Sequence, residues 1–566
     1  MRISQIPFRL RRAAVPASIL NCLLLGGLIL APAGTRAEEP QVFAITNARI
    51  VPVSAAAIES GAVVIRDGII EAVGAGISIP ADARVIDAKG LTLYPGLIDA
   101  LSNAGLEEAS LQPSAATRST ATTQGPATAG LSADEKQGLT PYLQAAELLN
   151  PAGRKIEAAR AAGITTALIA PRKGIFQGLS ALVNLSGISI GTMVVKTPVF
   201  LHIGLTRQGV GPTDYPGSLM GILAFVKQTF LDAQRYQLAR NMYKANPGVA
   251  RPEYSRALQA LEPALRQEIA VVIPGDTPAQ IQRALDLAAG LKLKMILVGG
   301  AEAGKMARVL KEAGVPVLLT AKFPERDRDA DPEAEEELAV LRRRVEASSH
   351  AAALANAGVP FAFESDDMAN PRDFIRNVGR SVESGLDRST ALRALTLTAA
   401  EILGAADKIG SIEKGKCANL FLATGDIFDP RTRVKLVFVD GRKFEIPEQE
   451  TSPPQPSQGG GTTAAAGTWT LRINSPQGPL EVTLKVQQFG STLTGTLTSP
   501  FGAVEISEGT VVGNRVSFKA NLNASAGGSF IVAFSGTIQG SAMTGSADAG
   551  IMGKMDFTGS KSPNEL

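Results

Sequence analysis

The sequence predicts an α/β fold with a parallel sheet, strand-rich flanks on both sides of it, and a separate all-β module at the end. Between about residues 153 and 404, helical segments alternate with short buried strands, a pattern typical of repeated β–α units. Residues 41–94 and 409–446 are instead typical of short strands joined by tight turns. These patterns indicate a parallel sheet that is either closed as a barrel or open and doubly wound.

The composition is that of an ordinary globular chain of two or three domains. Of the 566 residues, 45% are apolar and 19% are charged, and only one long apolar run occurs, which excludes a polytopic membrane protein. The first 37 residues carry five arginines and no acid, more than the net charge of +3, so the rest is nearly neutral. Nothing in this balance supports a nucleic-acid groove or a polybasic membrane surface.

Residues 1–37 have the pattern of a secretory signal. Four arginines precede an apolar run from Ile19 to Leu30, and small residues follow it. The run is shorter than the ~20 residues that span a bilayer, so we expect cleavage near Ala33 or Ala37 and no permanent membrane span. An exported protein, periplasmic or extracellular, is therefore predicted.

Histidine and cysteine are scarce. The two histidines, His202 and His350, and the two cysteines, Cys22 and Cys417, exclude any site that needs three or more ligands of either type. Because Cys22 leaves with the predicted signal, no intrachain disulfide is expected. Cys417 fits a small apolar filler better than a reactive thiol.

The first flank contains strand-like segments at 43–45, 62–65 and 69–73, and Asp67-Gly68 predicts a hairpin between the last two. Residues 109–135 are rich in Ala, Ser, Thr, Gly and Pro without an apolar period, so a mobile insertion is expected there.

Glycines are predicted to end the helices of the middle region, because a left-handed residue lets the chain turn into the next strand. Expected helices span 155–162, ended by Gly163, and 305–313, ended by Gly314. Thr277 and Pro278 open another, which we expect to end at Gly290. A further helix is expected to bury one apolar face and to end at Gly358; that face comprises Leu338, Leu341, Val345 and Ala352.

The last part of the chain is predicted to be a linker, 447–466, and an all-β module, 467–566. Proline and glycine dominate the linker. In the module, Leu493-Thr494-Gly495-Thr496 is echoed 50 residues later by Met543-Thr544-Gly545-Ser546, which suggests two similar halves of a small barrel or sandwich. Trp469 is expected to be a core residue at the barrel mouth.

Several ordered motifs together resemble the amidohydrolase superfamily, in particular its imidazolonepropionase-like branch. The match covers roughly residues 41–446 and rests on the segments 67–74, 87–90, 94–99, 162–166, 391–400 and 410–416. The resemblance implies a (β/α)₈ TIM-type barrel flanked by a composite β-sandwich. The implied domains are the sandwich from 38–94 and 409–446, and the barrel from 95–408.

The sequence departs from the family at the metal site. In the family, Pro-Gly-Leu-Ile-Asp is followed by His-x-His, the first two metal ligands, but Leu101 and Asn103 stand there. The middle strands end in Pro274-Gly275-Asp276 and Gly299-Gly300, without imidazole. Only Asp366 matches a family ligand, the strand-end aspartate. The family norm is zinc or another divalent metal, yet no cofactor and no metal ligand is predicted here.

Asp366 is the candidate catalytic residue, because it follows a buried strand at the end of the sheet where barrel active sites lie. Glu364 and Asp367 are close enough in sequence to raise the pKa of one carboxyl group, although a helix-capping role for Asp366 fits slightly better. Asn103, Asp276 and His202 are candidate substrate-binding residues; for His202 a hydrogen-bonded structural role is the stronger interpretation.

No functional role is expected for two further residues. His350 is expected to point to solvent, away from the apolar face of its helix. Lys196 is a candidate for the bridging lysine that the resemblance implies, but a surface lysine is the better interpretation.

Three functions remain open. The first is a degenerate family member that has lost the binuclear metal centre and acts by binding, or as a partner subunit, with an unknown small molecule or protein as its partner. The second is a hydrolase of non-peptide carbon–nitrogen bonds (amide, lactam or cyclic ureide) with an altered site around Asp366. The third is an envelope binding protein whose C-terminal module does the recognising. We rank them in this order, because the ligands are missing and a fold does not carry function without its site.

Overall fold

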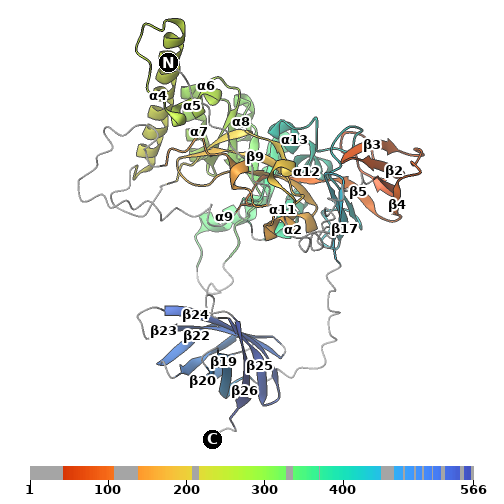
Figure 1. Cartoon of the computed structure of the whole chain (residues 1–566), viewed down its shortest axis with the longest axis vertical. Coiled ribbons are helices and arrows are strands. Elements are labelled where there is room, and N and C mark those ends of the chain that lie inside the picture. The colour runs from red at the N-terminus through yellow and green to blue at the C-terminus, as the bar shows by residue number, and fades with distance from the viewer. Residues whose placement is uncertain are drawn as a thin grey trace, which may run out of the picture. The chain divides into compact units, whose positions relative to one another are not determined.

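A computed structural model describes residues 42–106, 138–206, 216–326, 335–447 except 367 and 369, and 465–562 except short gaps at 476–477, 490–491, 500–501, 513, 524–528 and 549–553. The chain divides into two compact units, 1–448 and 449–566 (Figure 1). The predicted signal, the predicted insertion and nearly all of the predicted linker lie outside the described residues. Every helix within these ranges is too short or too polar to cross a membrane.

Strands from both flanks of the first unit form one eight-stranded sheet, ordered β18-β17-β16-β5-β1-β2-β3 with β4 paired to β1. β5 joins the flanks, because it pairs in parallel with β1 and antiparallel with β16, Tyr94 opposite Phe421. The strands are β1 (Phe43–Ile50), β2 (Ile58–Arg66), β3 (Ile69–Gly74), β4 (Arg84–Asp87), β5 (Thr92–Pro95), β16 (Leu420–Ala423), β17 (Val434–Val439) and β18 (Arg442–Glu445).

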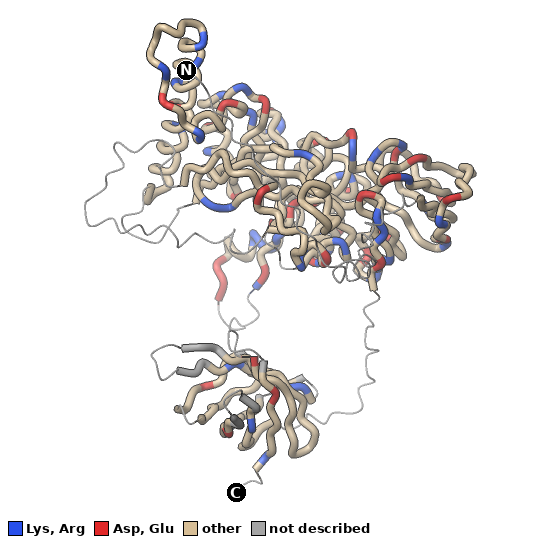
Figure 2. Tube along the Cα trace, in the orientation of Figure 1, with Lys and Arg blue, Asp and Glu red and all other residues tan. Residues whose placement is uncertain are grey.

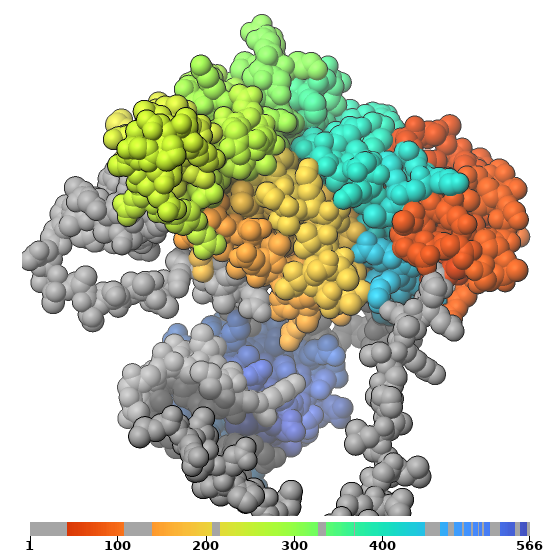
Figure 3. Space-filling model, turned by 45° about the horizontal axis from the view of Figure 1, so that its top comes forward, coloured from red at the N-terminus to blue at the C-terminus, as the bar shows by residue number. Residues whose placement is uncertain are grey.

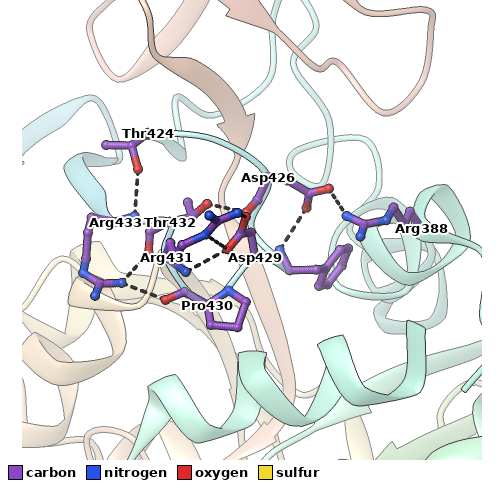
Figure 4. A network of polar contacts seen from close by, with 9 residues as sticks. Arg388, Thr424, Asp426, Asp429, Pro430, Arg431, Thr432 and Arg433 are labelled. Atoms are coloured by element: carbon purple, nitrogen blue, oxygen red, sulfur yellow. Dashed lines mark hydrogen bonds and ion pairs between the residues drawn. The ribbon is translucent and has the colours of Figure 1, made fainter. Parts of the chain in front are cut away.

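The loop between β16 and β17 is bound to a helix of the middle region (Figure 4). Asp426 pairs with Arg388 in α12 (Arg388–Ala394) and also accepts a hydrogen bond from the Phe428 backbone N–H, 2.9 Å. Within the loop, the side chain of Arg431 pairs with Asp429 at 2.8 Å, which with the Arg431 backbone N–H lowers the pKa of Asp429 to about 2. These ion pairs and hydrogen bonds therefore fix the conformation of the loop and attach it to α12.

The middle strands form two sheets. One is ordered β10-β9-β7-β6, and the other β15-β14-β13-β12-β11-β8. The bounds are β6 (Leu97–Ser102), β7 (Ile164–Ile169), β8 (Phe176–Leu179), β9 (Ala181–Asn184), β10 (Val194–Lys196), β11 (Phe200–Ile203), β12 (Ala270–Gly275), β13 (Met295–Gly299), β14 (Val317–Thr320) and β15 (Phe361–Glu364).

The two sheets are connected at both edges. Ser102 at the end of β6 forms a parallel bridge with Asp366 after β15, and the Asp366 N–H donates to the Leu101 carbonyl at 2.9 Å. At the other edge, only Ser180 separates β8 from β9, and its N–H donates to the Phe200 carbonyl at 2.9 Å. Strands β8 and β9 run antiparallel to β11 and β7, which is a departure from the all-parallel sheet predicted.

Alternate residues of these strands enter two different cores. One apolar cluster, called the inner cluster below, contains Ile98, Val272, Ile296, Leu318 and Ala362. The apolar neighbours of these residues in sequence belong to a larger cluster, which also contains buried residues of most helices. The helices are α2 (Arg154–Ala161), α3 (Ile190–Met193), α4 (Leu219–Ala245), α5 (Arg256–Ala260), α6 (Glu262–Leu265), α7 (Pro278–Leu291), α8 (Ala307–Ala313), α9 (Leu338–Glu346), α10 (His350–Ala357), α11 (Pro371–Glu383), α12 and α13 (Leu397–Leu403).

Two helix predictions are corrected. α7 starts at the predicted Thr277 cap, but it continues past Gly290 and ends where Lys292 takes the left-handed conformation, φ 55°. The helix expected around residue 345 is two helices, α9 and α10, separated by a 3₁₀ turn at Ala347–Ser349. Leu338, Leu341 and Val345, which all lie in α9, are exposed rather than buried.

The second unit is a closed antiparallel barrel of eight strands, in which β26 pairs with β19, so the prediction of a small barrel is confirmed. Trp469 is fully buried and its Nε1 donates to the Ala465 carbonyl at 2.8 Å. The strands are β19 (Gly467–Ser475), β20 (Gly478–Phe489), β21 (Thr492–Ser499), β22 (Gly502–Val512), β23 (Arg515–Asn523), β24 (Ser529–Gln539), β25 (Ala542–Asp548) and β26 (Lys554–Lys561).

The sequence echo of this barrel lies in β21 and β25, which have the same burial pattern. Leu493 and Met543 are both buried, and each faces a glycine in the next strand, Gly509 and Gly559. The two halves are thus built alike around equivalent positions.

Candidate functional site

Asp366 and Arg172 form an ion pair at the carboxyl ends of the middle strands. Asp366 follows β15 by two residues in the left-handed conformation, φ 50°, and one carboxylate oxygen accepts a hydrogen bond from Arg172 Nη1. Arg172 comes from the loop after β7. The exposed fractions of the two side chains, 23% for Arg172 and 39% for Asp366, place the pair at the boundary between core and solvent.

Asp99, on β6, lies buried beside this pair. Its Oδ2 accepts from the Ser365 hydroxyl at 2.5 Å, and its Oδ1 accepts from the Ser365 N–H at 2.9 Å. Burial raises the pKa of Asp99 to about 6, although these hydrogen bonds oppose the rise by favouring the charged form. Asp99 therefore links β6 to Ser365, the residue between the end of β15 and Asp366.

Glu364, the last residue of β15, is a second buried carboxyl group. Ala362 two residues earlier belongs to the inner cluster, so strand alternation turns Glu364 to the same side. Burial raises its pKa well above the usual value, and the charges of Asp366 and Asp99 raise it further. Its Oε2 has no hydrogen-bond partner among the described residues.

His202, on β11, has the same orientation, because Phe200 two residues earlier belongs to the inner cluster. It is buried, and its Nε2 has no hydrogen-bond partner in the described part of the chain. Burial lowers the pKa of His202 to about 3, with a further contribution from the Arg172 charge, so the imidazole is neutral at physiological pH. The second guanidinium nitrogen of Arg172, Nη2, is also buried without a partner within those ranges.

The other two candidate residues do not join this group through any observed bond. Asn103 is buried one residue beyond Ser102, and its carbonyl accepts from the Leu106 N–H. Asp276 is exposed, and its Oδ1 accepts from the Ala301 N–H at 3.3 Å, closing the loop after β13. Asp367 lies outside the described residues.

The residues at this site do not fit a binuclear metal centre. Leu101 is buried in the inner apolar cluster and offers no ligand atom. Asp366 already has a cationic partner in Arg172, whose guanidinium supplies the positive charge that a metal would otherwise bring to the carboxylate. No group of three or more His, Cys, Asp or Glu side chains suited to a metal occurs in the described ranges.

Two predictions outside the site are changed by the structure. His350, the first residue of α10, is buried rather than exposed, and it packs against Gly304; the ideal Cβ position of Gly304 is only 2.7 Å from His350 Nδ1. Lys196 is half-buried, and its Nζ donates to the carbonyls of Leu403 and Gly404, 3.2 and 3.0 Å, at the end of α13. Lys196 thus caps the C-terminal end of α13.

Arg172 and Asp99 were not among the predicted site residues, although both carried a signal. Arg172 follows a buried strand in Ala170-Pro171-Arg172-Lys173-Gly174, and the carboxyl ends of parallel strands are where α/β folds bind ligands. Asp99 closes the Pro-Gly-Leu-Ile-Asp motif itself. Its pairing with Ser365, 266 residues away, becomes visible only once β6 and β15 are adjacent.

Residues 277–444 match the model of the Amidohydrolase family. Among solved structures, an amidohydrolase from Thermotoga maritima MSB8 is 25% identical with a TM-score of 0.58, covering 71% of this chain and 100% of its own. A putative prolidase from Bifidobacterium longum is 18% identical with a TM-score of 0.43, covering 72% of this chain and 95% of its own. No curated protein matches the chain. The predicted resemblance to the amidohydrolase superfamily is therefore confirmed.

Proposed function

We propose that this chain is an exported, degenerate amidohydrolase that has lost the binuclear metal centre and acts by binding, or as a partner subunit. In this proposal the two connected middle sheets are the family's (β/α)₈ barrel, with β8 and β9 as its third strand. The eight-stranded sheet made from both flanks corresponds to the composite β-sandwich. The site then lies at the carboxyl ends of the barrel strands.

The ion pair between Arg172 and Asp366 carries this proposal. A divalent metal needs several anionic or imidazole ligands whose charge is not already compensated. Here the one family ligand that remains is neutralised by a permanent cation, and the first ligand position is apolar Leu101. To bind Asp366, a metal would have to displace the guanidinium of Arg172, and it would then have only one carboxylate ligand.

A small polar molecule suits this site better than a metal. Three buried polar atoms come from different strand ends and have no hydrogen-bond partner among the described residues: Arg172 Nη2, His202 Nε2 and Glu364 Oε2. Arg172 influences the pKa of both other groups. Buried polar groups are normally hydrogen-bonded, so a ligand or an ordered water is expected among them. The Arg172–Asp366 pair is neutral overall, and the imidazole of His202 is uncharged, which favours a neutral ligand.

Elemental analysis of the purified protein tests the proposal, together with assays on a panel of amides, lactams and cyclic ureides. We expect less than one tightly bound transition metal per chain and no chelator-sensitive hydrolysis. Asp366→Asn should leave any residual turnover unchanged, as should the control Asp276→Asn at an exposed carboxylate of another loop. Two metals per chain, or turnover abolished both by a chelator and by Asp366→Asn alone, would overturn it.

A second candidate, hydrolysis of non-peptide carbon–nitrogen bonds, is favoured by the unpartnered oxygen of Glu364. A buried carboxyl group whose pKa is raised by burial and by neighbouring carboxylates is suited to proton transfer. The two functions are separable: metal-independent turnover lost in Glu364→Gln but kept in Asp276→Asn would support hydrolysis without a metal.

A further inference from the structure

Helix α4 has two apolar faces, of which only one packs against the rest of the described chain. Its inner face packs through Phe225 and Phe230 on Phe176, with ring centroids 6.3 and 5.5 Å apart. Its outer face exposes four large apolar side chains: Met220 by 81%, Leu231 by 51%, Leu238 by 64% and Met242 by 64%. α4 stands out at one edge of its unit, as the ribbon and the space-filling view both show (Figures 1 and 3).

The four exposed residues form one narrow stripe. At ~100° per residue, spacings of 11, 7 and 4 residues return each side chain to within about 40° of the same direction. The stripe extends over 22 residues, roughly 33 Å of helix. A line of exposed large apolar side chains along one helix face marks an interaction site more often than scattered single residues do.

The stripe is symmetric about its centre. Met220 lies 11 residues before Leu231, and Met242 lies 11 residues after it. Leu238 lies seven residues after the centre, and seven residues before it stands Ala224, which is small and exposed. An antiparallel copy of the helix, related by a two-fold axis at Leu231, would therefore place methionine against methionine and leucine against alanine.

We propose that α4 pairs antiparallel with α4 of a second copy of this chain, with Leu231 on the two-fold axis. The interface is isologous, so each side supplies the same residues. Leu238 fills the space above the partner's Ala224, in the large-against-small manner of close helix packing. This symmetry favours a second copy of the chain over a different partner, because only pairing with an identical helix requires a symmetric stripe.

The polar residues beside the stripe agree with the same axis. Lys227 lies on one side of the stripe at the height of the partner's Gln234, and Arg235 lies on the other side at the height of the partner's Gln228. Like charges therefore do not face each other across the pair, and each cation meets an amide that accepts a hydrogen bond. In the described residues of the first unit, basic and acidic residues are interspersed (Figure 2). α4 itself carries four basic residues and one acidic residue, and one of the four, Arg240, is already paired with Glu262 at 2.7 Å.

A charge at the centre tests the pairing in the full chain. By light scattering after size exclusion, we expect the natural protein to have twice the monomer mass at micromolar concentration, and Leu231→Asp to be monomeric. Val345→Asp is the matched control, because Val345 is 79% exposed on α9, away from the stripe. It should remain a dimer, and circular dichroism should show that both variants stay folded.

Cross-linking tests the register. In a Cys417→Ser background, Leu231→Cys should form an intermolecular disulfide under mild oxidation, because the two copies meet at the axis. Met220→Cys should not, because the two copies lie roughly 33 Å apart, but Met220→Cys mixed with Met242→Cys should. A monomeric natural protein, a dimer unaffected by Leu231→Asp, or a disulfide from Met220→Cys alone would overturn the proposal.

Discussion

Asp440 lies in a small polar network between the flank sheet and the middle strands. Its carboxylate accepts from Asn184 Nδ2, and its N–H donates to Asn419 Oδ1 at 2.8 Å. Burial raises the pKa of Asp440 to about 6, above the ~3.9 of an unfolded aspartate. Because the folded pKa is the higher one, the stabilising effect is fully present below pH ~4 and is lost as the pH rises through about 6.

Asp440→Asn should therefore stabilise the protein at pH 8 and not at pH 4. Asparagine also accepts the left-handed backbone of this position, φ 52°. A shift of about two pKa units corresponds to ~3 kcal/mol, which partial exposure reduces to about 1–2 kcal/mol. Urea unfolding at the two pH values measures this. Asp87→Asn is the control: the Asn47 amide holds the pKa of that exposed carboxylate below its usual value, so a gain at pH 8 in both variants would contradict the explanation.

The pair Arg172–Asp366 should show a modest coupling energy. Both side chains are partly exposed, so a double-mutant cycle of Arg172→Met and Asp366→Asn is expected to give about 0.5–1.5 kcal/mol, decreasing with added salt. Arg172→Met alone should cost more than the coupling, because it also leaves Asp366 uncompensated beside Glu364. A coupling energy of zero would show that the pair does not hold the site.

At the scale of elements, two glycines of the second unit permit close contact between strands. A Cβ on Gly495 would lie 1.9 Å from the Lys485 carbonyl oxygen, and one on Gly545 would lie 2.2 Å from that of Ser535. Either change to alanine should destabilise the barrel by more than about 2 kcal/mol, because the obstacle is backbone. The unfolding of this unit can be followed by Trp469 fluorescence, since it is the chain's single tryptophan.

Gly290→Ala is the control, because it is expected to raise the stability of its unit, whereas the two barrel substitutions lower that of theirs. Gly290 lies inside α7 with open space at its Cβ position, so alanine should stabilise the first unit by about 0.5–1 kcal/mol. Trp469 fluorescence should not change in this variant. A loss of stability at Gly290, or none at Gly495 and Gly545, would refute the packing argument.

The elements that the sequence predicted well are those whose signal is local. The hairpin at Asp67-Gly68, the cap at Thr277 and the left-handed Gly314 need only their neighbours, and each is present. Lys292 shows the limit: a lysine accepts the left-handed conformation where the chain is held, here by Gln267 Nε2 bound to its carbonyl at 2.8 Å. Periodicity likewise cannot reveal the 3₁₀ turn before the buried His350.

The site was less predictable, because it depends on contacts between distant segments. Motif positions identified Asp366 and the apolar residue at Leu101 from the sequence. Arg172 lies 194 residues from Asp366, and nothing local shows that the two meet. The apolar residue at Leu101 could be recognised from the sequence, whereas the cation that pairs with Asp366 could not.

At the scale of the whole molecule, the two units have separate apolar cores and should unfold separately. We expect limited proteolysis between residues 448 and 464 to release two folded fragments, each with its own thermal transition. Trp469 fluorescence should report only the transition of the second fragment. If the first fragment aggregates once it is freed, the two units depend on each other and the expectation fails.

The sheet built from both flanks has a consequence for the nascent chain. Tyr94 donates to the Gly425 carbonyl at 3.2 Å across 331 residues, and β5 needs β16 to complete its pairing. At the usual 5–20 residues per second, a ribosome needs roughly 15–65 s to make the intervening segment. During that time one edge of β5 offers unpaired backbone groups to any other strand, the kind of edge that folded proteins protect. The flank that is synthesised first is therefore among the last parts of its unit to be completed.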